Sequence, residues 1–173
     1  MNIVDELNVA NSKPVSLKVA TYVGADVSRF KKLMQLVLGD NFELAQRASW
    51  AMEFCYEAHP FLLKPYVDDL LRLMSRKDCH DAVHRNSAKI LETMDLNEEQ
   101  QSIAWDIGIQ LLQKMETKVA VKAYLMFILA KIAKEYEELA AELLAIIEMQ
   151  YPYSSPGFKA RAKKVYKMLG KQI

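Results

Sequence analysis

A set of basic side chains recurs along this sequence at a nearly constant spacing, and basic side chains can bind anions. The set is Arg47, Arg85, Lys122 and Lys159, which follow one another at intervals of 38, 37 and 37 residues. Because arginine and lysine form charge-assisted hydrogen bonds with carboxylates, a row of such cations favours an anion or an acidic peptide as the ligand. We expect a binding ridge made of this row and its neighbours. The neighbours are Trp50, His84, Tyr124 and Arg161.

The same row has a structural explanation. An acidic residue stands in the turn upstream of each of the first three cations, at Asp40, Asp78 and Glu116. Cations that reach these turns would tie neighbouring repeats together, each exposed pair contributing about 0–1 kcal/mol. The sequence leaves both explanations open.

Cys79, His80 and His84 are the residues to consider as metal ligands. The two His stand four residues apart and share one face of a helix, whereas Cys79 points roughly 100° away from His80. Zinc needs three or four converging ligands, and no distant Cys/His cluster supplies the rest. The sequence also has no glycine-rich phosphate loop, GxSxG or HExxH motif. We therefore expect no metal, no cofactor and no catalytic residue.

The segments that position these side chains are helical. The chain has 173 residues, of which 51% are apolar and 26% charged, with five Gly and five Pro. This composition indicates an all-α protein with a sizeable core. Residues 117–133, TKVAVKAYLMFILAKIA, are apolar on nearly all sides, so we expect a central helix that is buried on more than one side.

A unit of about 37 residues, made of a leucine-rich helix, a turn and a second helix, occurs four times. We expect a single domain, residues 1–173, in which the hairpins stack into a short right-handed solenoid after capping helices in 1–25. The hairpins span about 26–58, 60–95, 97–134 and 136–170. In such an array each unit hides its apolar face against its neighbours, and equivalent side chains line up.

A turn acid followed by an apolar residue, a basic residue and a small residue resembles the HEAT repeat of the armadillo-like superfamily. Val121-Lys122 and Phe158-Lys159 carry this pattern. Longer stretches resemble a family of short bacterial helical-repeat proteins. They are FELAQRASWAMEF (42–54), KVAVKAYLMF (118–127) and YPYSSPGFKARAKKV (151–165). The resemblance implies an alpha-alpha superhelix that serves as a protein-binding scaffold.

Members of that bacterial family are often labelled adenylosuccinate lyase. The mobile loop of such a lyase has the form SSxMPxKxN, and its Ser abstracts a proton. The stretch from Ser154 to Lys159 shares Ser-Ser, a displaced Pro and the Lys with this loop, but it has neither the Met nor the Asn. We keep lyase activity as a further alternative.

Two groups of residues place aromatic rings beside carboxylates: Trp50 with Glu53 and Tyr56, and Trp105 with Asp106. On a HEAT-like scaffold this is similar to DNA glycosylases, which hold a damaged base between aromatic rings near an Asp. We favour core packing for these aromatics, and a net charge of +1 argues against a nucleic-acid partner. A nucleic-acid-binding or glycosylase-like protein is the alternative function.

The remaining features concern the compartment. Cys55 and Cys79 form no CxxC pair, the N-terminus does not resemble a signal peptide, and no apolar run reaches about 18 residues. These features indicate a cytoplasmic protein that does not enter the membrane. We predict a non-enzymatic interaction module, a monomer or weak dimer, whose concave face binds a protein or an acidic peptide.

Overall fold

The computed structural model of the protein describes residues 1–171, in which every regular element is a helix. The α-helices are α1 (Ile3–Val9), α2 (Lys13–Val23), α3 (Val27–Val37), α4 (Phe42–Ala58), α5 (Val67–Ser75), α6 (Asp81–Thr93), α7 (Glu98–Gln113), α8 (Val119–Ala133), α9 (Glu137–Gln150) and α10 (Pro156–Met168). Two 3-10 helices, η1 (Pro60–Tyr66) and η2 (Tyr151–Tyr153), precede α5 and α10. The predicted all-α fold class is confirmed.

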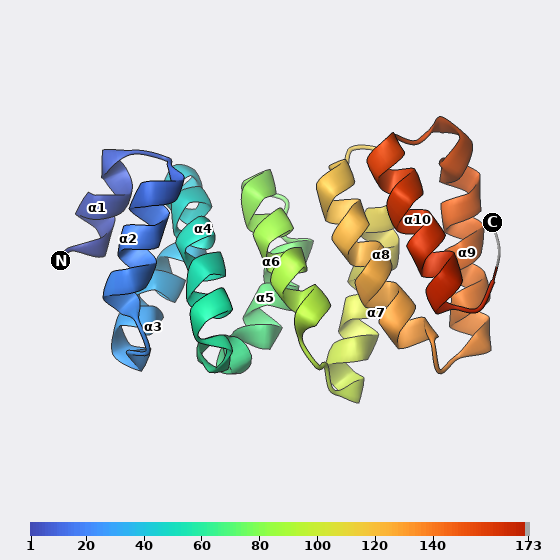
Figure 1. Ribbon diagram of the computed structural model, residues 1–173, viewed down its shortest axis with the longest axis horizontal. Coiled ribbons are helices and arrows are strands. Elements are labelled where there is room, and N and C mark those ends of the chain that lie inside the picture. Colours follow the sequence, from blue (N-terminus) through green and yellow to red (C-terminus); the bar gives the residue numbers. More distant parts are fainter. Residues whose placement is uncertain (172–173) are drawn as a thin grey trace. The chain divides into compact units, whose positions relative to one another are not determined.

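The chain forms two compact units, and the boundary between residues 90 and 91 lies inside α6. In the first unit, α4 packs against α1, α2 and α3. Figure 1 shows α2 and α4 side by side, with α3 behind them. Side chains from several helices form the core of this unit. Leu7 of α1, Phe30 of α3 and Leu63 of η1 are each at most 1% exposed.

Helix α8 is the central helix of the second unit. It packs against α7, α9 and α10, and nine of its 15 residues are buried. Figure 1 shows α8 and α10 side by side. The contact with α7 is close, because a Cβ atom added at Gly108 would lie 2.8 Å from Cδ2 of Leu129. The prediction of a helix buried on more than one side is confirmed.

The predicted hairpin at 60–95 begins with a 3-10 helix. Pro65 lies inside η1. Proline has no N–H to donate, and in an α-helix its ring would clash with the carbonyl of Phe61. The tighter 3-10 form therefore carries the chain to Val67, where α5 begins.

Polar contacts between neighbouring hairpins join residues about one repeat apart. In the first unit, Asn86 Nδ2 donates to Ser49 Oγ, 37 residues away, at 3.0 Å. In the second unit, Arg161 Nε donates to the carbonyl oxygen of Ala123, 38 residues away, at 3.0 Å. This spacing matches the period of about 37 residues in the sequence.

Candidate functional site

The second helix of each predicted hairpin buries the same three positions, which gives these helices a common register. The positions are Ala45, Ser49 and Met52 in α4; Val83, Ser87 and Ile90 in α6; Val121, Leu125 and Ile128 in α8; and Phe158, Ala162 and Val165 in α10. Counted from the first position, Arg47 and Arg85 stand two residues further on, whereas Lys122 and Lys159 stand one residue further on. One residue turns a helix by roughly 100°. The four cations therefore occupy two different positions on their helices rather than one.

The two arginines of the first unit differ in their surroundings. Arg47 Nη1 donates to the carbonyl oxygen of Leu7 at 3.2 Å and to Asn8 Oδ1 at 3.3 Å, which ties α4 to α1. Its Nη2 lies 3.4 Å from a carboxylate oxygen of Glu43, on its own helix. Arg85 is exposed, and its Nε donates to Asn86 Oδ1 at 3.2 Å. Arg47 therefore has a structural role, whereas the guanidinium of Arg85 faces solvent.

Lys122 is a buried cation. The residue is 5% exposed, and its Nζ donates to Gln150 Oε1 at 2.7 Å. Gln150 in turn donates from Nε2 to the carbonyl oxygen of Leu112 at 2.9 Å, so one amide links α7, α8 and α9. Burial lowers the pKa of Lys122, although the negative charge of Glu116 opposes this shift.

Arg161 connects α10 to two aromatic rings of α8. Its guanidinium carbon lies 3.8 Å from the ring centre of Phe127 and 5.4 Å from that of Tyr124. Its Nη2 is 2.6 Å from a carboxylate oxygen of Glu92, at the end of α6. Burial raises the pKa of Glu92 even though Arg161 favours its charged form. Arg161 is thus held on every side by neighbours within the second unit.

Lys159, the remaining predicted cation, contacts the loop between α9 and α10. Lys159 Nζ donates to the carbonyl oxygen of Pro152 at 3.3 Å. Ser154 Oγ donates to the carbonyl oxygen of Gln150 at 2.7 Å, and Ser155 Oγ accepts the N–H of Phe158 at 3.4 Å as the N-cap of α10. Both hydroxyls thus have local structural partners, and the lyase interpretation of this loop stays a prediction.

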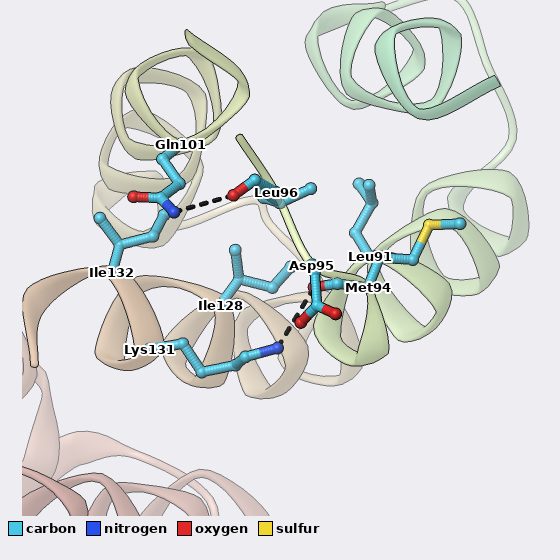
Figure 2. Close-up of a pocket in the computed structure, with 8 residues that line it drawn as sticks. All are labelled: Leu91, Met94, Asp95, Leu96, Gln101, Ile128, Lys131 and Ile132. Carbon is cyan, nitrogen blue, oxygen red and sulfur yellow. Dashed lines mark hydrogen bonds between the residues drawn. The ribbon is translucent and has the colours of Figure 1, made fainter. Parts of the chain in front are cut away.

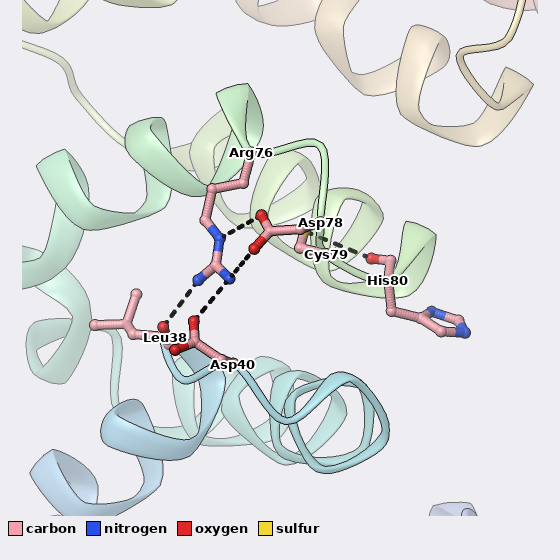
Figure 3. A network of polar contacts seen from close by, with 6 residues as sticks. All are labelled: Leu38, Asp40, Arg76, Asp78, Cys79 and His80. Carbon is pink, nitrogen blue, oxygen red and sulfur yellow. Dashed lines mark hydrogen bonds and ion pairs between the residues drawn. The ribbon is translucent and has the colours of Figure 1, made fainter.

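The acidic turns pair with a cation that the sequence pattern did not single out. Arg76 follows α5, and its guanidinium lies 3.1 Å from Asp40 and 3.0 Å from Asp78. It also donates to the carbonyl oxygen of Leu38 at 3.0 Å, at the end of α3 (Figure 3). The hydrogen bond from Arg76 lowers the pKa of Asp78. The sequence contains one signal for this contact. Arg76 and Gln150 stand 74 residues, or two repeats, apart, and each donates to a carbonyl group near the end of the first helix of the preceding hairpin.

The two tryptophans have different environments. Trp105 is buried at 9% exposure, as core packing predicts. Trp50 is partly exposed and stacks on Phe54, with ring centres 6.4 Å apart and ring planes 27° from parallel. Lys13 Nζ lies 6.0 Å from the ring centre of Phe54. The core interpretation therefore holds for Trp105, whereas Trp50 lies partly at the surface.

Cys79, His80 and His84 form no ligand set. His80 Nδ1 accepts the N–H of Ala82 at 3.0 Å, and the buried Nε2 of His84 has no hydrogen-bonding partner among the described residues. Within residues 1–171 no group of three or more His, Cys, Asp or Glu is placed to hold a metal ion. Burial raises the pKa of Cys55 to about 12 and that of Cys79 to about 11, so both remain thiols at neutral pH.

Two cavities of the second unit contain a lysine. The smaller, of about 140 Å³, lies beside Leu96 and Ile128 (Figure 2), where Lys131 Nζ donates to the carbonyl oxygens of Glu92 and Met94 at 3.0 and 3.3 Å. That lysine caps the end of α6. The larger cavity has a volume of about 510 Å³, and we call it the Lys122 pocket. Its lining residues are Gln113, Met115, Thr117, Val119, Lys122, Ile146, Met149, Gln150, Tyr153, Ser154, Ser155 and Phe158.

Comparison with known proteins agrees with the helical pairs and their period. A family model described as the HEAT repeat domain matches residues 3–169, so the chain belongs to the HEAT repeat family. Proteins of this class stack two-helix repeats and expose extended surfaces on which partners can bind. No curated protein and no solved structure matches the chain. No helix in the described part of the chain is long and apolar enough to cross a membrane.

Proposed function

We propose that the protein is a non-enzymatic interaction module that binds a protein segment through the exposed side chains of its second helices, on the concave face of the repeat array. Membership of the HEAT repeat family supports a scaffold role. The observation that carries the proposal is the partly exposed stack of Trp50 and Phe54 on α4, with the exposed Arg85 on the neighbouring α6.

These residue types suit a docking surface. Trp and Arg are enriched among the side chains that dominate binding energy at protein interfaces. A partly exposed ring can be covered by a partner without any change in the fold, and that burial contributes about 25 cal/mol for each Å² of apolar surface. Among the described residues, Asn86 is the hydrogen-bonding partner of Arg85, and it accepts from Nε. The two terminal nitrogens of Arg85 are then available to a carboxylate of the partner.

The exposed lysines of α10 favour an acidic partner as well. Lys163, Lys164 and Lys167 are exposed on α10. The other two predicted cations of this unit are not available to a protein partner at the surface, because Arg161 is paired with Glu92 and Lys122 is buried. The proposed binding surface therefore consists of Trp50, Phe54 and Arg85 in the first unit. The three lysines of α10 form a separate basic patch within the second unit.

Partner capture with charge-reversed protein tests the proposal. Immobilised wild type should capture a partner from a lysate of the source cells, and mass spectrometry would identify it. Arg85→Glu should reduce its capture about tenfold, because a repulsive charge replaces a salt bridge at the contact. Trp50→Ala should weaken capture to a similar extent through lost burial.

The control variant is Lys31→Glu, which reverses an exposed charge on α3, the first helix of its hairpin, and should leave capture unchanged. Circular dichroism and thermal unfolding would establish that each variant folds. A folded Trp50→Ala/Arg85→Glu double variant that captures as much partner as wild type would contradict the proposed surface. Lys122 is unsuitable for this test because it is buried.

A further inference from the structure

The Lys122 pocket combines a buried charge with apolar walls. It lies among the ends of α7 and α9, the starts of α8 and α10, and η2. Its volume of about 510 Å³ falls within the range of about 300–1,000 Å³ that is typical of small-molecule sites. The pocket lies entirely within the second unit.

Lys122 has capacity for a further acceptor. Its ammonium group can donate three hydrogen bonds, and within the described residues its Nζ has one partner, Gln150 Oε1. Glu116 is the acidic residue whose charge acts on it, but the structure places no carboxylate within ion-pair distance of its Nζ in residues 1–171. A buried ammonium without a counter-ion is unfavourable, so an anion that enters the pocket would be strongly favoured there.

Two helix N-termini at the pocket add to this positive potential, whereas the C-terminal residues of α7 and α9, Gln113 and Gln150, bring negative dipole ends that oppose it. Val119, the first residue of α8, lines the pocket, and the side chain of the N-cap residue, Lys118, makes no capping hydrogen bond to this helix. Ser155, the N-cap residue of α10, lines it too. The free N–H groups and the positive dipole end of a helix N-terminus stabilise an anion.

The walls of the pocket are apolar and accessible. Met115, Met149 and Tyr153 are 85%, 71% and 93% exposed, although methionine is among the residues most often buried. Ile146 and Phe158 are buried and complete the apolar lining. The flexible thioether side chains of Met can adapt to the shape of an apolar ligand.

We propose that the Lys122 pocket binds a small monocarboxylate with an apolar chain. The carboxylate accepts from Lys122 Nζ and lies at the first turn of α8, while the chain covers Met115, Met149 and Tyr153. One cation matches one anionic group, and the volume matches a small molecule. This site is separate from the proposed docking surface and does not depend on it.

Titration calorimetry with ligands of equal chain length tests the proposal. The probes are decanoate, decan-1-ol and decylamine, added to the full-length protein. Decanoate should bind saturably with one molecule per chain, decan-1-ol about tenfold more weakly, and decylamine without saturation. Equal affinity for decanoate and decan-1-ol, or no saturable binding of decanoate, would overturn the proposal.

Two pairs of variants locate the site. Lys122→Met keeps the length of the side chain and removes the charge, so it should abolish the preference for decanoate over decan-1-ol. Lys163→Met removes an exposed lysine of α10 and should keep the preference. Met149→Asp places a negative charge at the mouth of the pocket and should weaken the binding of decanoate. Val27→Asp makes a similar change at a 64% exposed position of the first unit and should leave decanoate binding unchanged. Preserved decanoate preference in both Lys122→Met and Met149→Asp would exclude this pocket.

Discussion

At the scale of single residues, the predicted cations have separate roles. Arg47 and Arg161 hold helices together, Arg85 faces solvent, and Lys122 lies at a pocket. Register separates Lys122 from Arg47 and Arg85, because a shift of one residue turns a side chain by roughly 100° around its helix. Arg47 and Arg85 share a register, and they differ because α1 lies against Arg47. A spacing that looks uniform in the sequence therefore gives different environments.

Lys122→Met should leave the protein at least as stable as wild type at neutral pH. The methionine has no charge to desolvate, and this gain should at least offset the lost hydrogen bond from Nζ to Gln150 Oε1, which is worth about 1.5–3 kcal/mol. Gln150 keeps its bond to Leu112 in the variant. Urea unfolding of both proteins at neutral pH measures the difference, and a loss of more than about 2 kcal/mol would show that the ammonium stabilises the fold.

The difference in the free energy of unfolding between wild type and Lys122→Met should depend on pH with a definite sign. The pKa of Lys122 is lower in the folded protein than its ordinary value of 10.5, because of burial. Between these two pKa values the unfolded chain binds more protons, so the stability of wild type rises with pH relative to the variant. The cost of the buried charge is present in full below the folded pKa. Unfolding experiments on both proteins at neutral and alkaline pH should show a smaller difference in the free energy of unfolding at alkaline pH.

At the scale of elements, the contacts of helix ends and helix faces decide which hairpins fit together. Arg76 caps α3 and Gln150 caps α7 at equivalent positions two repeats apart. The two side chains differ in charge but satisfy the same terminal carbonyl groups, which have no partner within the helix. The repeat therefore preserves a hydrogen bond even where the residue type changes.

Gly108→Ala should destabilise the packing of α7 on α8. The new methyl group would lie 2.8 Å from Leu129 Cδ2 and 3.2 Å from its Cγ, and Leu129 is fully buried. Overpacking costs about 1–3 kcal/mol, which exceeds the helix-propensity gain of about 1 kcal/mol. We expect a net loss of about 1 kcal/mol, measurable by urea unfolding.

The matched control for this prediction is Gly157→Ala in the first turn of α10. There the nearest neighbouring atom, Ser155 Oγ, is 3.9 Å from the added Cβ, so no clash arises. This variant should gain up to about 1 kcal/mol from lower chain entropy in the unfolded state. Equal effects of the two substitutions would argue against the close approach of α7 and α8.

At the scale of the whole molecule, charge bears on the choice between a protein and a nucleic-acid partner. The net charge of the chain is +1, from 23 basic and 22 acidic residues. Proteins that bind nucleic acid electrostatically show a strongly basic balance and an affinity that falls steeply with salt. The alternative of a nucleic-acid-binding protein therefore has weak electrostatic support.

We expect no micromolar binding of a duplex DNA at low salt, measured by fluorescence anisotropy with a labelled oligonucleotide. A matched single strand would test binding by stacking on Trp50. Micromolar affinity that declines with salt would favour the nucleic-acid alternative over the interaction module. In that case Lys163→Glu should reduce the salt dependence, since this exposed lysine would contact phosphate.

The sequence by itself determined the helical class, the period of about 37 residues and the central position of α8. These properties depend on local propensity and on apolar spacing, both of which can be read along the chain. The capping box at the start of α7 is local in the same way, because the side chains of Asn97 and Gln100 each accept the backbone N–H of the other residue. HEAT repeat membership agrees with all of this.

Only the tertiary structure decided which side chains are buried, which are exposed and which line a cavity. The pairing of Asp40 and Asp78 with Arg76 depends on where α3 ends relative to the turn after α5, and that distance is set by packing. The pocket at Lys122 arises where five elements meet, with Gln150 brought in from 28 residues away. Such arrangements depend on contacts between segments that are far apart in the chain, and no local pattern of residues specifies them.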